Sequence, residues 1–234
     1  MTPSSPSAPD HHAELPSAVL FDLDGTLVDS ERLWLDAIRS RLETSGMPVS
    51  AALLARFEGL STVDAASALI AVGGLAGSET EVADELEELT IDAFAGRLPW
   101  IRGAEEALGS LRRAGIPLAL VTSSTRRWVA AVAETVALGT FDVVVTADDV
   151  RHTKPHPEPY LRATDLLGVD PGSCLVFEDS AVGVRAAIGA GCRVVQVRAD
   201  QQDATCTATD RIPDLRPVSA RWVAALHARE PALR

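Results

Sequence analysis

The chain has 234 residues and a formal net charge of −12, with 47% apolar but only 4% aromatic residues. This length accommodates one domain, or a core domain that carries an insertion. The acidic balance argues against broad binding to nucleic acid or to anionic membrane surfaces, because both carry negative charge. No apolar run approaches the roughly eighteen residues of a membrane span. The 21 basic residues comprise 20 arginines and one lysine, Lys154.

The N-terminal segment and the cysteines indicate the cellular compartment in which we expect the protein. Residues 1–16 are rich in Pro, Ser and Ala and have neither a basic start nor an apolar segment, so we expect a disordered tail rather than a signal peptide. The three cysteines are odd in number and widely spaced, and none forms a C-x-x-C pair. This pattern is typical of a reducing compartment, and we expect a cytoplasmic protein.

The first half of the chain is mostly helical in pattern. It opens with a short apolar run at 18–21, which indicates a buried strand and stops at an Asp- and Gly-rich turn. A helix pattern then begins at Asp29 or Ser30, either of which is a good N-cap, and ends near Gly46. Further helical patterns continue to about residue 97, and the clearest of them spans 79–94.

From residue 98 onward, predicted strands alternate with single helices. The expected helices are 104–115, 127–138, 158–168, 181–190 and 218–228, and the expected strands are 116–121, 141–146, 174–177 and 193–197. Such alternation is typical of βαβ units with a parallel sheet covered on both faces. The predicted fold is therefore α/β: a doubly wound parallel-sheet (Rossmann-like) core with an inserted all-helical cap domain.

The predicted domain boundaries follow from this change of pattern. We expect a tail at 1–16, an α/β core at 17–31 and 100–234, and a helical cap at 32–99. The cap segment contains five arginines and eleven acidic residues, so about half of the net charge lies in less than a third of the chain.

Polar side chains follow several of the predicted strands directly. Ligands of open parallel sheets bind beyond the carboxyl ends of the strands, so these side chains are expected to share one edge. They are Asp22, Asp24, Thr122, Glu178 and Asp179, and Lys154 lies in the loop after a further strand. Two charges about 4 Å apart interact by roughly 4 kcal/mol at an effective dielectric near 20. Four crowded carboxylates therefore require a cation, and Mg²⁺ fits their hard oxygen ligands best.

Four segments carry a resemblance to a known family. FDLDGTLVDS at 21–30, LVTSS at 120–124, KPHPEPY at 154–160 and VFEDSAVGVRAAIGAG at 176–191 resemble the four motifs of the haloacid dehalogenase-like hydrolase superfamily, in the same order and spacing. The helical insert sits where the subfamily of beta-phosphoglucomutase and the small sugar and polyol phosphatases carries its cap.

The resemblance implies roles for individual residues in phosphoryl transfer. Asp22 would be the nucleophile that forms an aspartyl-phosphate, and Asp24 would protonate the leaving oxygen and later activate water. The phosphoryl oxygens would be bound by Thr122 and Lys154, helped by backbone N–H groups around Leu23 and Ser123.

The same resemblance implies a magnesium site. Mg²⁺ would be held by the Asp22 carboxylate, the Asp24 backbone carbonyl and Asp179, with Glu178 in or near the outer shell. A lysine at position 154 agrees with this chemistry, since a compact ammonium contacts a phosphoryl oxygen and a carboxylate together more readily than a planar guanidinium does.

Within the family, the residues favour a phosphatase of small sugar or polyol phosphates. Dehalogenases lack the second Asp of the first motif, which is present here as Asp24. A phosphomutase of the beta-phosphoglucomutase kind is the alternative, although that branch carries a His where Trp34 stands and an Arg near Thr62. Candidate specificity contacts in the insert are Trp34, Gly59 and Ser61, and Trp34 is equally compatible with a place in the cap core.

A non-enzymatic receiver-like phospho-acceptor is the remote alternative, because receiver domains also combine clustered aspartates, a Thr and a Lys on a parallel sheet. Receivers are about half this length, lack a cap and carry the acceptor Asp on a different strand from the acidic pair. The expected partner is therefore a small phosphorylated metabolite, bound by a monomer.

Overall fold

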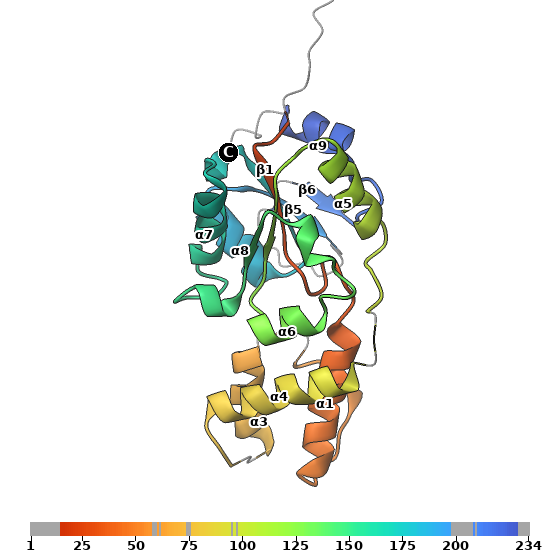
Figure 1. Ribbon diagram of the computed structural model, residues 1–234. Helices are drawn as coiled ribbons and strands as arrows, with labels where there is room; N and C mark the ends of the chain where they lie inside the picture. The colour runs from red at the N-terminus through yellow and green to blue at the C-terminus, as the bar shows by residue number, and fades with distance from the viewer. Residues whose placement is uncertain are drawn as a thin grey trace, which may run out of the picture.

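Figure 1 shows the computed structural model, which describes residues 15–57, 60, 62–73, 76–94, 96, 98–197, 208 and 210–228. The α/β part of the molecule lies at one end, and the helices of the insert lie at the other.

The centre of the α/β part is a six-stranded sheet in which every pair of neighbours is parallel, in the order β3-β2-β1-β4-β5-β6. The strands are β1 (Ala18–Phe21), β2 (Leu118–Val121), β3 (Val143–Val145), β4 (Cys174–Glu178), β5 (Arg193–Val197) and β6 (Asp210–Ile212). β1 pairs with β2 on one side and β4 on the other, so the loops that follow these strands meet at the middle of one edge. The predicted parallel sheet is confirmed, and β6 is an edge strand that the sequence pattern did not indicate.

Helices cover both faces of this sheet. They are α5 (Ala104–Arg113), α6 (Arg126–Ala131), α7 (Glu158–Leu167), α8 (Ala181–Gly189) and α9 (Ala220–His227), with short 3-10 turns η1 (Leu138–Thr140), η2 (Ala147–Asp149) and η3 (Pro171–Ser173). The core on one face packs against α5, α6 and α9, and the core on the other packs against α7 and α8. Since β1, β2 and β4 are buried along their whole length, both faces contribute hydrophobic burial.

The helix predicted at 127–138 is only half correct. α6 ends at Ala131, and the chain continues through turns to η1. The buried hydroxyl of Thr135 in this segment accepts a hydrogen bond from Leu98 N at 3.0 Å, and Val132 and Val136 are completely buried. The turns therefore allow these side chains to make tertiary contacts. A continued helix would point the same side chains in other directions.

The insert between β1 and β2 is helical, as predicted. It comprises α1 (Glu31–Thr44), α2 (Ala51–Leu54), α3 (Thr62–Gly73) and α4 (Glu79–Ala93). α4 begins with a capping box, in which Ser78 and Glu81 satisfy each other's backbone N–H groups. These helices share a hydrophobic cluster of their own, which includes Ile38, Leu69 and Leu86.

The insert contacts the α/β part through α4 and α6. The hydroxyl of Thr125, the N-cap residue of α6, donates to Glu87 of α4, and Arg127 lies 3.3 Å from Glu88. Phe94, at the end of α4, packs edge-on against Trp128 with 6.2 Å between ring centroids. These contacts hold the insert over the carboxyl ends of the central strands. None of the helices in the described ranges is long and apolar enough to cross a membrane.

Candidate active site

The predicted polar residues do meet at the carboxyl edge of the sheet. Asp22 follows β1 and donates its backbone N–H to Phe177 of β4 at 3.0 Å, while Thr122 follows β2 and Glu178 ends β4. A cavity of about 290 Å³ opens there and is bounded on its other side by residues of α1, α3 and α4. Its size suits a small metabolite.

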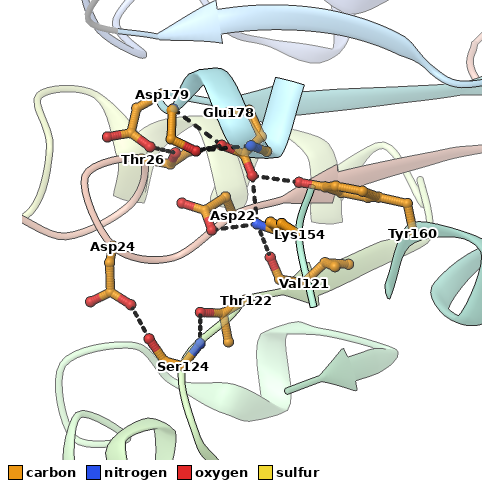
Figure 2. A network of polar contacts seen from close by, with 12 residues as sticks. Asp22, Asp24, Thr26, Val121, Thr122, Ser124, Lys154, Tyr160, Glu178 and Asp179 are labelled. Atoms are coloured by element: carbon orange, nitrogen blue, oxygen red, sulfur yellow. Dashed lines mark hydrogen bonds and ion pairs between the residues drawn. The ribbon is translucent and has the colours of Figure 1, made fainter. Parts of the chain in front are cut away.

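Lys154 joins the central acidic residues, as Figure 2 shows. Its Nζ lies 2.7 Å from Asp22 Oδ1, 2.5 Å from Glu178 Oε1 and 2.9 Å from the backbone oxygen of Val121, and its side chain is only 3% exposed. The three N–H bonds of an ammonium thus have three acceptors, which a planar guanidinium with its fixed fork could not match in the same space.

Glu178 is the most enclosed of the acidic side chains that the structure describes, with no exposed surface. Besides Lys154, it accepts hydrogen bonds from the hydroxyl of Tyr160 at 2.7 Å and from the Ser180 backbone and hydroxyl at 3.3 and 3.1 Å. A Cβ atom on Gly183 would lie 1.8 Å from Glu178 Oε1, so the first turn of α8 closes directly over this carboxylate. A buried charge needs such complete pairing to persist.

The environment shifts the pKa values of both partners of the central ion pair. Burial, reinforced by the charge of Glu178, raises the pKa of Asp22 to about 7, although Lys154 opposes the shift. Burial disfavours the charge of Lys154, but the carboxylates of Asp22 and Glu178 outweigh it and raise the lysine pKa above its ordinary value. Lys154 is therefore a permanent cation, whereas Asp22 needs further positive charge nearby to stay ionised at neutral pH.

A candidate cation site lies beside this pair. Asp22, Glu178 and Asp179 each offer a carboxylate oxygen, and the three oxygens lie within 4.8 Å of one another. The hydroxyl of Thr26 lies 3.5 Å from Asp179 Oδ1. Gly25, whose φ is +84°, lets the loop pass so close to Asp179 that a Cβ would lie 2.0 Å from its Oδ2. This all-oxygen, anionic donor set fits a hard divalent cation such as Mg²⁺.

Asp24 is in the site but outside this cluster of carboxylates. Its Oδ1 accepts hydrogen bonds from Ser30 Oγ at 2.6 Å and Trp128 Nε1 at 2.9 Å, and its Oδ2 accepts one from Ser124 Oγ at 2.7 Å (Figure 2 shows the last). Ser30 is the N-cap residue of α1, but its hydroxyl makes no capping bond and is used here instead. Three neutral donors from three segments thus hold the Asp24 carboxylate apart from the cluster of Asp22, Glu178 and Asp179.

Three of the four candidate phosphate-binding residues, Thr122, Ser123 and Lys154, line the cavity, and Leu23 does not. The Thr122 hydroxyl accepts a hydrogen bond from Ser124 N at 3.0 Å. The side chain of Leu23 is completely buried, so this residue can offer the cavity only its backbone.

Trp34 is the described member of the three candidate contacts in the insert. It lines the cavity and also packs against the hydrophobic cluster of the insert. Its indole Nε1 is buried and has no hydrogen-bond partner among the described residues. Gly59 and Ser61 lie outside the described residues.

Several polar residues of the site were not singled out from the sequence. Tyr160 belongs to the KPHPEPY segment and is the chain's only tyrosine, which was a usable signal. Ser30 and Ser124 lie within the motif segments 21–30 and 120–124, but no contact with Asp24 was assigned to them there, and Trp128 carried no signal. The contacts of all three depend on where α1 and α6 pack.

Comparisons with known proteins agree with this geometry. The family model for haloacid dehalogenase-like hydrolases matches residues 16–191. Validoxylamine A 7'-phosphate phosphatase of Streptomyces hygroscopicus subsp. limoneus is 37% identical over 74% of this chain and 81% of its own length. Hexitol phosphatase A of Escherichia coli is 36% identical over 77% of this chain and 82% of its own.

Solved structures agree in fold. The crystal structure of beta-phosphoglucomutase from Clostridium difficile superposes with a TM-score of 0.75, covering 91% of this chain and 97% of that one at 19% identity. At this identity the similarity concerns the fold alone. From the family match, which spans three quarters of the chain, and from the curated relatives, it follows that this protein belongs to the haloacid dehalogenase-like hydrolases.

Proposed function

We propose that the protein is a Mg²⁺-dependent phosphatase that hydrolyses small phosphate monoesters of the sugar or polyol class. The observation that carries the proposal is the buried Asp22–Lys154 pair, flanked by the carboxylates of Glu178 and Asp179 at the floor of a metabolite-sized cavity. Two curated relatives above 30% identity are phosphatases by name, validoxylamine A 7'-phosphate phosphatase and hexitol phosphatase A.

The reaction proceeds in two displacements on phosphorus. A carboxylate oxygen of Asp22 attacks the phosphorus and forms an aspartyl-phosphate while the bond to the leaving alkoxide breaks. Asp24 donates a proton to that alkoxide, which departs as an alcohol, and then takes a proton from the water that attacks the aspartyl-phosphate. Phosphate is released and both carboxyl groups return to their starting states.

The phosphoryl group is held by groups around the cavity floor. Lys154 and Thr122 place a cation and a hydroxyl against its oxygens, together with the backbone N–H groups of Leu23 and Ser123. Because Lys154 already contacts Asp22 at 2.7 Å, it also aligns the nucleophile with the phosphorus.

The residues that would hold Mg²⁺ are Asp22, Asp179 and the Asp24 backbone carbonyl, with Glu178 in or near the outer shell. When bound, the ion would supply the positive charge that keeps the Asp22 carboxylate ionised and offsets the charge of the phosphoryl oxygens.

The division of labour within the chain is part of this proposal. Residues 17–31 and 100–234 form the catalytic core, and 32–99 form a cap that shields the reaction from water and contacts the leaving group through Trp34. Gly59 and Ser61, the other two candidate contacts, lie outside the described residues, as does the expected tail at 1–16 apart from its last two residues. We place the enzyme in the cytoplasm as a monomer, in line with the free, buried thiols of Cys174 and Cys192.

The test is phosphate release from a panel of sugar and polyol monophosphates, followed with and without Mg²⁺. We expect turnover that stops on addition of EDTA and falls at least about a thousandfold in Asp22→Asn, since that change removes the nucleophile. Asp165→Asn, which alters an exposed pair with Arg162, is the control and is expected to retain activity.

Two results would replace this proposal. A hexose 1-phosphate converted to its isomer without phosphate release would favour the phosphomutase that shares this fold. Stoichiometric labelling of the protein with no turnover of any ester would favour a phospho-acceptor. Full activity of Asp22→Asn would contradict the mechanism itself.

A further inference from the structure

The cavity wall opposite the phosphate-binding floor is acidic. The described residues that line the cavity include six acidic side chains and a single basic one, Lys154. Three of the acidic residues belong to the floor, namely Asp22, Asp24 and Asp179. The other three are Glu31 of α1, Asp64 of α3 and Glu87 of α4, so each of three insert helices contributes one.

The hydrogen bonds given for Glu87 and Asp24 come from neutral donors. Glu87 accepts from the hydroxyl of Thr125, and Asp24 accepts from two serines and the indole of Trp128. These donors orient both side chains and bring no positive charge to the cavity. Lys154, the one cation among the described lining residues, is already paired with Asp22 and Glu178 on the floor.

The remaining wall adds aromatic surface. Trp34 and Trp128 both line the cavity, so two indole side chains border the same space as these carboxylates. Indole faces attract cations.

We propose that this acidic wall selects substrates by the charge of the leaving group. The enzyme acts on monophosphates of neutral or amine-bearing polyols and sugars, and it rejects esters that carry a second phosphate or a carboxylate. This inference rests on the proposed phosphatase function. A second anionic group would have to enter beside Glu87 and its neighbours, whereas an ammonium would be attracted by the same carboxylates and by the two indoles.

Three commercially available esters separate charge from size. Glucosamine 6-phosphate, glucose 6-phosphate and 6-phosphogluconate share six carbons and a phosphate on the terminal carbon. The first carries an ammonium on carbon 2, the second only hydroxyls, and the third a carboxylate at carbon 1. We expect kcat/KM to decrease in that order, with at least about a tenfold difference between the last two at low ionic strength. Added salt should reduce the difference.

Two neighbouring glutamates of α4 provide a matched pair of variants. Glu87→Gln removes a charge from the cavity wall and can still accept from Thr125, so it should raise kcat/KM for 6-phosphogluconate relative to glucose 6-phosphate by about threefold or more. Glu88→Gln removes the same charge from the exposed side of the helix, where Glu88 pairs with Arg127, and should leave the ratio unchanged. Equal melting temperatures would show that both variants fold.

The outcomes distinguish a failure of the charge selection from a failure of the proposed phosphatase function. If none of the three esters nor any other monoester is hydrolysed, the proposed function fails. If the esters are hydrolysed but kcat/KM does not follow the charge order, or if Glu87→Gln and Glu88→Gln behave alike, the charge selection is overturned while the phosphatase stands.

Discussion

Lys154 shows how much of this site depends on one side chain. Its ammonium makes three contacts of 2.5 to 2.9 Å, to Asp22, Glu178 and the backbone of Val121, in a space with almost no exposure. Arginine fills every other basic position in the chain, so the lysine is a departure from its composition. The three acceptors explain the departure, because they surround a point charge rather than a plane.

Lys154→Arg is therefore expected to damage the site although it preserves the charge. The larger guanidinium must displace at least one of the three acceptors, and we expect kcat/KM for a monophosphate to fall at least about a hundredfold, with a lower melting temperature. Arg112→Lys is the reciprocal control, because Arg112 lies at the surface and pairs with Asp142 at 2.9 Å. Activity of Lys154→Arg within about threefold of the wild type would show that any cation suffices.

At the scale of an element, α8 can pack directly against Glu178 because Gly183 has no side chain. Ser180 caps the helix by accepting from Gly183 N, and it also donates to Glu178, so the helix start and the buried carboxylate are built together. A Cβ on Gly183 would lie within 2.2 Å of both carboxylate oxygens. The first turn of α8 can approach β4 this closely only with glycine at 183.

Two glycines of α8 give opposite predictions for the same substitution. Gly183→Ala must move Glu178, so we expect a loss of about 2 kcal/mol or more in the free energy of unfolding together with lost activity. Gly189→Ala would place its Cβ 3.5 Å from Pro157, an ordinary contact, and should stabilise the protein by about 0.5–1 kcal/mol through helix propensity. Urea unfolding of the two variants measures both effects. Equal midpoints would contradict this description of α8.

At the scale of the whole molecule, the buried carboxyl group of Asp22 makes the stability of the folded protein depend on pH. Burial and Glu178 raise the pKa of Asp22 to about 7, from an ordinary value of 3.8. In the metal-free protein, the folded state therefore keeps a proton on Asp22 over a pH range in which the unfolded chain has lost it. The contribution of Asp22 to stability is complete below about pH 4, decreases as the pH rises toward 7, and is constant above that.

Asp22→Asn removes this dependence and so reports on it. In EDTA, the melting temperature of the variant relative to the wild type should rise by about 3 °C or more between pH 5.5 and pH 8, because only the wild type must ionise a buried carboxyl. Using the difference between the two proteins cancels the titration of groups that they share. A difference that stays flat over this range would mean that Asp22 ionises normally in the fold.

The sequence by itself determined the order of strands and helices, the helical insert and the residues at the strand ends. These features are encoded locally: hydrophobic periods, glycine stops and turn residues act within a few positions. Local patterns were insufficient at two places in the chain. The helix expected at 127–138 stops at Ala131, where Thr135 is needed by Leu98, and the short edge strand β6 left no pattern that could be recognised.

Only the tertiary structure decided how the site is assembled from these parts. Lys154 contacts Asp22 across 132 positions of the chain, and Trp128 contacts Asp24 across 104, so neither pairing follows from a local pattern. The packing of α7 and α8 likewise brings Tyr160 and Ser180 against Glu178. The packing of α4 places Glu87 at the cavity. A sequence states which charges a protein carries, but packing decides which of them meet, because the energy of a charge depends on its distance from others and on the burial they share.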